Sequence, residues 1–353
     1  MCRLLLYKGK SPIQLAHLLT KPAHSIINQS FDSRLRIDHR RPINGDGFGV
    51  GWYEHDSDKS DVTPCIFTSV TPAWNNTNLI RLADKIKSEL VFAHVRASTA
   101  GSVSETNCHP WNFGRLMWMH NGGIGQFERI KRKLQSTLRE ELFLFVQGNT
   151  DSEWAFALFL NQLDDPHSDS FKHTELKAAM LKSIELINQW TKEADITESS
   201  LLNFAVTDGE SVVCTRYISS KTEEAASLYF SSGTRFEQYQ EGHYRMVKAD
   251  RREDIVLVAS EPLTFERADW LTIPTNTLVV ITPKLSVLLY PIVDEYYNPD
   301  PTSRGSADGK RTGDPYLQKE KELADAYMKM ELAQEDYAKT RKRDMAPHTI
   351  KAA

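Results

Sequence analysis

The sequence predicts an α+β fold in which strands and helices occupy separate stretches of one domain. Short apolar runs bounded by turn residues dominate residues 3–120 and return over residues 201–290. Between them, residues 129–191 carry apolar side chains at helical spacing. Strands followed by helices and then by more strands indicate segregated layers, whereas alternating βαβ units would indicate a parallel sheet. We therefore expect residues 2–295 to form a single domain.

The three blocks divide into elements at turn and capping residues. In the first block we expect strands over residues 3–8, 47–53, 64–69, 90–96 and 115–120, with helices over 13–19 and 78–89. The helical block divides into 129–145, 151–163 and 176–191. In the last block we expect strands over 201–207, 211–217, 227–231, 254–259, 277–281 and 285–290. Several clusters of polar residues then fall at the ends of strands.

The composition changes after residue 295. Residues 296–315 are rich in Pro, Gly, Ser, Asp and Arg, which predicts a flexible linker. Residues 316–353 predict a charged helix and tail, with an apolar stripe at Tyr316, Leu323, Met330 and Tyr337. A stripe this narrow suits a helix that lies on the domain surface or one that binds a partner.

The bulk composition excludes several classes of protein. The net charge of -4 provides no basic field, so we expect no nucleic-acid partner. The sequence has no run of about 18 apolar residues, so we expect no membrane span. The four cysteines are too few for a disulfide framework in a chain of this length, which fits a reducing compartment. These features predict a cytoplasmic protein.

Cys2 is the first candidate catalytic residue. Removal of Met1 would leave Cys2 with a free α-amino group, whose pKa is ordinarily about 7.7–8.0. One residue would then supply both a sulfur nucleophile and the base that activates it. A strand that begins directly afterwards would hold this residue rigidly.

Three polar clusters supply groups that could act on an acyl substrate. Arg96 follows a strand and offers a planar fork for a carboxylate, although an Arg in that position can equally be an ion-pair partner. Asn121 and Gly122 offer a side-chain amide and a backbone N–H for an oxyanion, although Asn-Gly is also a common turn. Asp151 can bind a substrate ammonium group or cap a helix.

Together these clusters resemble the class II glutamine amidotransferases. In that family a mature N-terminal cysteine, here Cys2, attacks a γ-glutamyl carbonyl. The resemblance assigns Arg96, within Ala-His-Val-Arg-Ala-Ser-Thr, to the substrate carboxylate and Asp151, within Thr-Asp-Ser-Glu, to its ammonium group. It assigns Asn121 and Gly122, within His-Asn-Gly, to the oxyanion hole.

The same resemblance implies a set of supporting residues. Asn107 and His109 form an Asn-x-His-Pro element that the family packs behind the site. Thr99 and His120 lie within the motifs that contain the substrate-binding arginine and the oxyanion-hole asparagine. Ala97 follows the arginine, where the better-known synthases of the family carry an aromatic residue.

The resemblance also implies the fold and the reaction. It implies a four-layer αββα N-terminal-nucleophile hydrolase sandwich, followed by a C-terminal helical tail. Within the family, stretches such as Thr-Pro-Ala-Trp-Asn-Asn are most similar to the amidotransferase-type subunit of the fungal glutathione-degrading complex. This similarity implies cleavage of the γ-glutamyl bond of glutathione, which releases glutamate and Cys-Gly. It further implies a partner subunit with WD40-repeat and metallopeptidase-like regions.

Two other functions remain open at this point. The chain could hydrolyse glutamine and deliver ammonia to a separate synthase, or it could be a non-catalytic scaffold subunit. A zinc site is disfavoured because the cysteines and histidines lack the paired spacing of zinc ligands, as in His94, Cys108, His109 and His120. We therefore expect neither a metal nor a cofactor.

Overall fold

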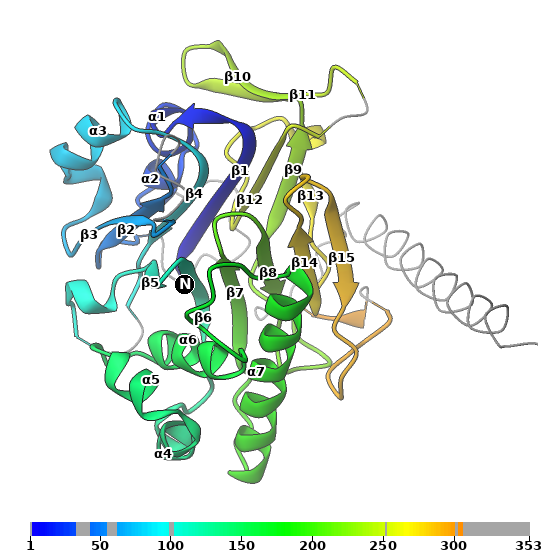
Figure 1. Cartoon of the computed structure of the whole chain (residues 1–353). Helices are drawn as coiled ribbons and strands as arrows, with labels where there is room; N and C mark the ends of the chain where they lie inside the picture. The colour runs from blue at the N-terminus through cyan, green and yellow to red at the C-terminus, as the bar shows by residue number, and fades with distance from the viewer. Residues whose placement is uncertain are drawn as a thin grey trace, which may run out of the picture.

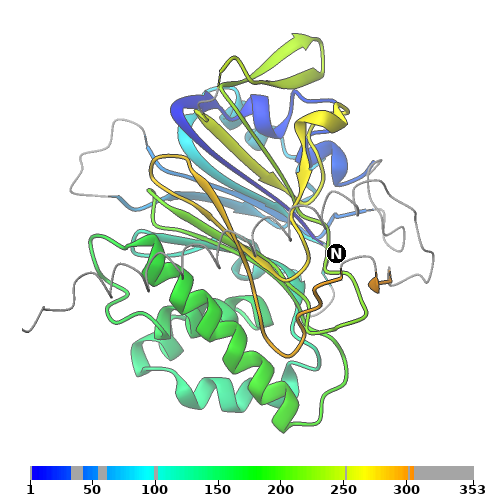
Figure 2. The ribbon, with the colours of Figure 1, turned by 90° about the vertical axis from the view of Figure 1, so that its right-hand side faces the viewer.

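Two antiparallel β-sheets lie face to face, and helices cover the outer face of each (Figures 1 and 2). The computed structural model describes residues 2–32, 43–54, 62–98, 102–250, 253–300 and 303–305. This arrangement is the four-layer αββα sandwich that was expected. The C-terminal helical tail predicted over residues 316–353 lies outside the described residues.

The first sheet has seven strands and contains the start of the chain. Its spatial order is β13 (Leu271–Thr272), β9 (Tyr229–Gly233), β12 (Ile255–Ala259), β1 (Arg3–Gln14), β4 (Lys87–Val95), β2 (Phe48–Trp52) and β3 (Cys65–Ser69). β1 is hydrogen-bonded along both edges, to β12 and to β4. The N-terminal strand is therefore central rather than an edge strand.

The second sheet has six strands. Its order is β15 (Val287–Pro291), β14 (Thr277–Ile281), β8 (Val212–Arg216), β7 (Leu201–Thr207), β6 (Leu116–Gly123) and β5 (Trp111–Phe113). A separate hairpin, β10 (Arg235–Gln240) and β11 (His243–Val247), projects beyond the first sheet (Figure 1).

β1 is buried on both faces. Leu4 and Leu6 point into the core between the two sheets, whereas Leu5 and Tyr7 point into the core beneath the outer helices. Successive side chains of a strand face opposite sides of its sheet, so a strand covered on both sides reads as a continuous apolar run. The run Leu-Leu-Leu-Tyr after Arg3 has this character.

Among the described residues, the outer face of the second sheet is covered by α4 (Glu128–Thr137), α5 (Glu140–Phe145), α6 (Asp151–Asn161) and α7 (His173–Glu193), and that of the first by α1 (Ala16–Leu19), α2 (Ile26–Gln29) and α3 (Thr77–Ala83) (Figure 2). Single 3-10 turns occur at Ala73–Asn75, Glu105–Asn107 and Arg267–Asp269. Trp118 of β6 packs against Phe156 and Phe159 of α6, which joins the helical layer to the sheet.

Most predicted elements are confirmed, and three of the predicted helices differ most from the structure in their bounds. The helix expected over 13–19 covers only Ala16–Leu19, because β1 continues to Gln14 and pairs with β4. The helix expected over 78–89 ends at Ala83, and β4 begins at Lys87. The helix expected over 129–145 is broken into α4 and α5 by the extended residues Leu138 and Arg139.

Several short elements were not predicted. They are α2, β5, β13 and the β10–β11 hairpin. The hairpin alternates exposed polar residues with the buried Phe236, Tyr244 and Met246, which pack into the core beneath the outer helices. Its burial pattern is regular, but Gln-, Glu- and Arg-rich segments have low strand propensity in the sequence.

The chain remains bound to the domain beyond residue 295. Arg304 donates hydrogen bonds to the carbonyl oxygens of Ser220 and Glu223, and Gly305 N–H donates to Thr222 O at 2.8 Å. The described part of the predicted linker is therefore docked on the domain. The rest of residues 296–315 lies outside the described ranges.

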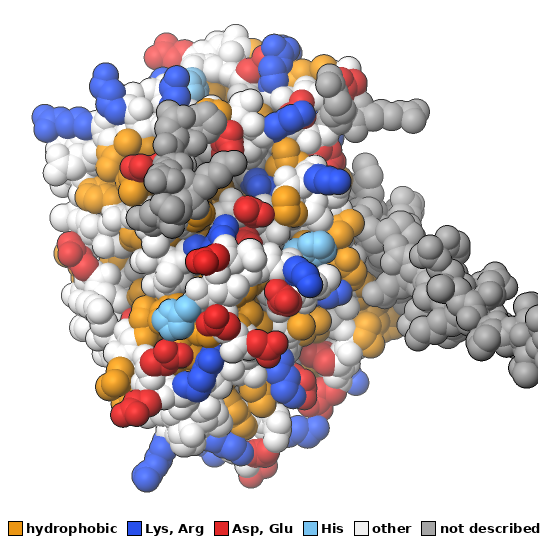
Figure 3. Space-filling model, in the orientation of Figure 1, with side chains coloured by type: hydrophobic (Ala, Val, Ile, Leu, Met, Phe, Trp, Pro, Cys, Tyr) orange, Lys and Arg blue, Asp and Glu red, His pale blue; other side chains and the backbone are white. Residues whose placement is uncertain are grey.

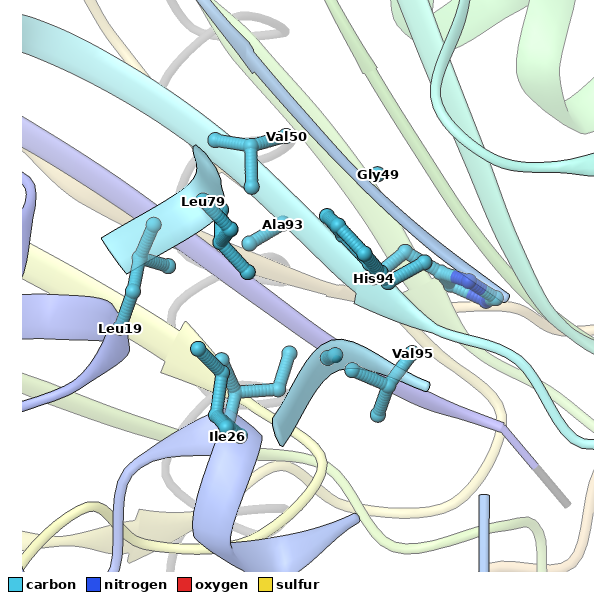
Figure 4. Close-up of a pocket in the computed structure, with 11 residues that line it drawn as sticks. Leu19, Ile26, Gly49, Val50, Leu79, Ala93, His94 and Val95 are labelled. Atoms are coloured by element: carbon cyan, nitrogen blue, oxygen red, sulfur yellow. The ribbon is translucent and has the colours of Figure 1, made fainter. Parts of the chain in front are cut away.

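A small apolar hollow lies between α1–α3 and the outer face of the first sheet (Figure 4). Leu19, Ile26, Leu79, Val50 and Ala93 line it, and its interior has room for about one water molecule. It is a packing defect rather than a substrate site. Among the described helices, none is long and apolar enough to cross a membrane.

Glycines on the inner face of β2 allow the two sheets to approach each other. A methyl group at Gly49 would lie 2.1 Å from the backbone oxygen of His109. We predict that Gly49→Ala lowers the free energy of unfolding by about 1–3 kcal/mol, because backbone must move to admit the methyl group. Urea denaturation measures this, with Gly305→Ala as the control, where the nearest atom is 3.9 Å away. Equal stabilities of the two variants would contradict the prediction.

Candidate active site

The predicted site residues gather at one end of the sandwich. β1 starts there, β4 and β12 end there, and β6 ends opposite them in the second sheet. Arg3 at the start of β1 is paired with Val95 at the end of β4. Four of the sequence-predicted positions, Cys2, Arg96, Asn121 and Gly122, lie at these strand ends, and Asp151 at the start of α6 reaches the end of β6 through the N–H of Ile124.

Cys2 precedes β1 and is half-buried. Its Sγ lies 3.4 Å from the backbone nitrogen of Ala97 and 3.6 Å from that residue's carbonyl oxygen. Burial raises the pKa of the thiol, while the Ala97 hydrogen bond and the charges of Arg96 and Arg3 lower it by less. The thiol is thus held by backbone groups beside a cluster of fixed cations.

Arg96 is buried directly after β4. Its guanidinium donates to Ser102 O at 3.2 Å and to Ser98 Oγ at 3.4 Å. Its backbone N–H donates to Gly47 O at 2.8 Å, which ties the residue to the segment before β2. Asp46, which also precedes β2, binds the loop after Arg96, because its carboxylate accepts the N–H of Ser98 at 2.7 Å. Hydrogen bonds therefore hold the backbone of Arg96, its guanidinium and the start of the loop that follows it.

Asn121 and Gly122 lie at the end of β6. Asn121 is on the inter-sheet face, is 2% exposed, and donates from Nδ2 to Ser260 Oγ at 3.1 Å. A side chain is impossible at Gly122, because a Cβ would lie 1.8 Å from Leu201 O on β7. Backbone and side-chain amides are therefore adjacent at this strand end.

Asp151 begins α6 and faces the chain that leaves β6. Its Oδ2 accepts the backbone N–H of Ile124 at 2.7 Å, and its Oδ1 lies 3.4 Å from Ser152 Oγ. The aspartate is half-buried rather than sealed from solvent. A carboxylate in this setting keeps lone pairs for a cationic group.

Asn107 connects the loops that carry the arginine and the aspartate. It donates from Nδ2 to Ser102 O at 2.9 Å and accepts the N–H of Asn149 at 3.2 Å. The Ser102 carbonyl oxygen also accepts a hydrogen bond from the Arg96 guanidinium, so Arg96 and Asn107 share one acceptor, and Asn107 links it to the loop before Asp151. Glu153 stabilises the loop before α6 by accepting hydrogen bonds from the N–H groups of Gln147 and Gly148.

Three buried histidines lie behind the site. His109 Nδ1 is 2.8 Å from His94 Nε2, which is 3.2 Å from the carbonyl oxygen of His120. His120 Nε2 lies 2.9 Å from Leu201 O and its Nδ1 lies 2.8 Å from Ser152 Oγ. A carbonyl only accepts, so Nε2 of His94 and of His120 carries the proton. Burial lowers all three pKa values, that of His94 to about 3, so the rings are neutral.

The other predicted supporting residue, Thr99, lies outside the described residues. In the part of the chain that the structure describes, no group of three or more His, Cys, Asp and Glu side chains is arranged to hold a metal ion. His94 and His109 pack against each other as core residues do. They do not form a set of metal ligands.

A buried ion pair at the start of β1 was not predicted. Arg3 Nε lies 2.5 Å from Glu261 Oε1, and both side chains are almost fully buried. Arg3 also donates to the carbonyl oxygen of Cys2 at 2.9 Å, and His24 lies 3.5 Å from the second carboxylate oxygen. The sequence signal was an arginine inside an otherwise apolar strand, which requires a buried acid somewhere in the fold.

Comparison with known proteins identifies the family. A family model described as glutamine amidotransferases class-II matches residues 15–288. The chain belongs to the class II glutamine amidotransferases. It is also 58% identical over 311 residues to the "Probable glutamine amidotransferase DUG3" of Saccharomyces cerevisiae, which covers 85% of this chain and 87% of that relative. Membership of this family supports an amidohydrolase activity.

More distant relatives agree with this assignment. A "Gamma-glutamyl-hercynylcysteine sulfoxide hydrolase" of Mycobacterium tuberculosis is 29% identical over 125 residues, which is 35% of this chain and 50% of that protein. A solved glutamine aminotransferase class-II domain protein from Silicibacter pomeroyi superposes with a TM-score of 0.55 at 21% identity, covering 83% of this chain and all of that one. The structural match confirms the N-terminal-nucleophile hydrolase fold of this class II amidotransferase.

The Arg3–Glu261 pair should dominate the stability of the N-terminal strand. Glu261→Gln leaves a buried arginine without its counter-charge, and we expect it to lower the free energy of unfolding by about 3–5 kcal/mol. Chemical denaturation checks this, with Glu185→Gln as the control because its partner Lys182 is exposed. The control should leave stability nearly unchanged. A loss below about 1 kcal/mol in Glu261→Gln would refute the assigned role.

Burial should slow reaction of the Cys2 thiol in chains that retain Met1. Its pKa is raised above the ordinary value of 9.0, so the thiolate fraction near neutrality is lower than in a free cysteine. We expect the iodoacetamide rate of the Cys2 peptide, followed by mass spectrometry, to keep rising beyond pH 9. The same peptide in unfolded protein is the control. A midpoint below about 8.5 in the folded protein would contradict the burial argument.

Proposed function

We propose that this class II amidotransferase hydrolyses the γ-glutamyl bond of glutathione through a thioester on Cys2. The observation that carries the proposal is the convergence of Cys2, Arg96, Asn121 and Asp151 at one end of the sandwich. Each group has the chemical type that one part of a γ-glutamyl substrate requires. A scaffold subunit would not need a buried arginine, an oxyanion donor and a half-buried acid around one thiol.

Arg96 and Asp151 hold the glutamate end of the substrate. The guanidinium binds the α-carboxylate and the Asp151 carboxylate binds the α-ammonium group. These two charges lie on loops joined through Asn107, so their separation is fixed by shared hydrogen bonds. The γ-carbonyl carbon is thereby presented to Cys2.

Removal of Met1 frees the α-amine of Cys2. This amine takes the thiol proton, and the thiolate attacks the γ-carbonyl carbon. The Asn121 side-chain amide and the Gly122 N–H stabilise the oxyanion. Collapse breaks the C–N bond, and the protonated amine donates its proton to the departing nitrogen of Cys-Gly. Water then hydrolyses the thioester and releases glutamate.

The similarities support a γ-glutamyl substrate to different degrees. The mycobacterial relative is named for hydrolysis of a γ-glutamyl compound, whereas the yeast relative is named for a glutamine amidotransferase. The second name favours the alternative function, in which glutamine is hydrolysed and ammonia passes to a synthase. Both reactions use the same glutamyl-binding residues and differ in the leaving group.

The proposal extends to a partner and a location. As the family resemblance implies, the partner is a subunit with WD40-repeat and metallopeptidase-like regions, in the cytoplasm. The four cysteines are free thiols, which suits a reducing compartment. On the face in Figure 3, acidic and basic side chains are intermixed, which offers no basic patch there for a nucleic acid.

Glutamate release by the Met1-trimmed protein tests the function. We expect release from glutathione to exceed release from glutamine, and Cys2→Ala to abolish both because the nucleophile is lost. Intact mass confirms the trimming, and each assay is repeated with the candidate partner. A preference for glutamine would favour ammonia delivery. Near-normal release by Cys2→Ala would refute the thioester mechanism.

A further inference from the structure

Ser260 links the nucleophile strand to the oxyanion-hole asparagine. It follows β12, and its backbone N–H donates to Leu4 O at 2.9 Å. Its Oγ in turn accepts the N–H of Leu4 at 3.0 Å. Ser227 Oγ donates to the Ser260 carbonyl at 2.9 Å and fixes this position from the other side. Ser260 is therefore immobilised against the strand that carries Cys2.

The contact between Ser260 and Asn121 crosses from one sheet to the other. Asn121 Nδ2 lies 3.1 Å from Ser260 Oγ, and both side chains are almost fully buried. Asn121 Oδ1 is also buried and has no hydrogen-bond partner among the residues that the structure describes. In this arrangement the serine oxygen accepts two hydrogen bonds, while the asparagine carbonyl oxygen accepts none.

A half-turn of the Asn121 amide would pair the Ser260 hydroxyl proton with Asn121 Oδ1 and leave the amide nitrogen, instead of the oxygen, without a partner. The turn exchanges Oδ1 and Nδ2 without changing the outline of the planar group. Ser260 Oγ–H then donates to Asn121 Oδ1 and still accepts the Leu4 N–H. The amide nitrogen moves to the buried position that has no partner. A donor in that position can bind an anionic oxygen, whereas a carbonyl oxygen there would repel it.

We propose that Ser260 is a positioning residue that orients the Asn121 amide by donating to its Oδ1. The amide nitrogen is thereby directed to the substrate oxyanion during formation of the thioester. This role rests on the proposed function, because it supposes that Asn121 acts as an oxyanion donor. Ser260 acts through Asn121, the site residue to which its side chain is hydrogen-bonded.

A double-mutant cycle on kcat tests the proposal. The four full-length, Met1-trimmed proteins are wild type, Ser260→Ala, Asn121→Ala and the double variant, each assayed with γ-glutamyl-p-nitroanilide. Ser260→Ala should lower kcat more than about tenfold with little change in KM, and less than the roughly 10²–10³-fold expected when the donor is removed. In the Asn121→Ala background the serine change should alter kcat less than about twofold. Equal effects in both backgrounds, or none, would overturn the proposal.

Two controls separate orientation from folding. Ser260→Thr keeps the hydroxyl and should restore most of kcat, whereas Ser260→Cys keeps the shape with a weak donor and should remain slow. The rate at which iodoacetamide alkylates Cys2 measures the reactivity of the thiol. This reaction does not require an oxyanion donor. The rate should be unchanged in Ser260→Ala, and a parallel fall in alkylation and kcat would assign the serine a merely structural role.

A measurement that does not depend on enzyme turnover determines the orientation of the Asn121 amide directly. Neutron diffraction from deuterium-exchanged crystals distinguishes the amide nitrogen from its oxygen and locates the Ser260 deuteron. A deuteron between Ser260 Oγ and Asn121 Oδ1 is expected, and an amide nitrogen facing Ser260 Oγ would overturn the proposal. Failure of the proposed function has a different signature, which is release of p-nitroaniline that persists in Cys2→Ala.

Discussion

Burial of β1 on both faces is the constraint on which the site depends. Leu4 and Leu6 fill the core between the sheets, and Leu5 and Tyr7 fill the core beneath α1 and α2. A register shift of one residue would exchange these two sets and turn the first residue of the chain to the other face. Hydrogen bonds to β4 and β12 on either edge oppose such a shift. The core therefore orders the N-terminal segment, which in most proteins is mobile.

The polar side chains at this end of the sandwich include buried charges, and each buried charge needs a balancing partner. Arg3 is neutralised by Glu261 on the helix side of the sheet, so the cation beside the nucleophile is fixed in place. The histidines are kept neutral by burial, and His94 of β4 donates a hydrogen bond to the carbonyl oxygen of His120 in β6. A protonated His94 would add positive charge next to Arg96 in a low-dielectric space. The neutral His94 ring ties the two sheets together without that repulsion.

Local sequence patterns predicted the layered fold and the grouping of polar residues at strand ends, because apolar periodicity and turn residues act over a few positions. The same patterns missed the boundary between α3 and β4, where Lys87 and Ser88 continue a helical charge pattern but pair with β1. They also missed Ser260 and Glu261, whose partners Leu4 and Arg3 are more than 250 residues away in the chain. Such contacts are set by strand order, which no local pattern specifies. Arg3 alone carried a signal, as a charge within an apolar run.

The orientation proposed for Asn121 also explains how an apparent defect can favour catalysis. A buried amide donor without a partner costs about 1–3 kcal/mol in the resting site. The ground-state carbonyl of a substrate would recover part of that cost, and the oxyanion recovers more because hydrogen bonds to charged groups are stronger. Only the interaction gained between those two states accelerates the reaction. Ser260, held by Leu4 and Ser227, maintains the unsatisfied orientation until the oxyanion forms.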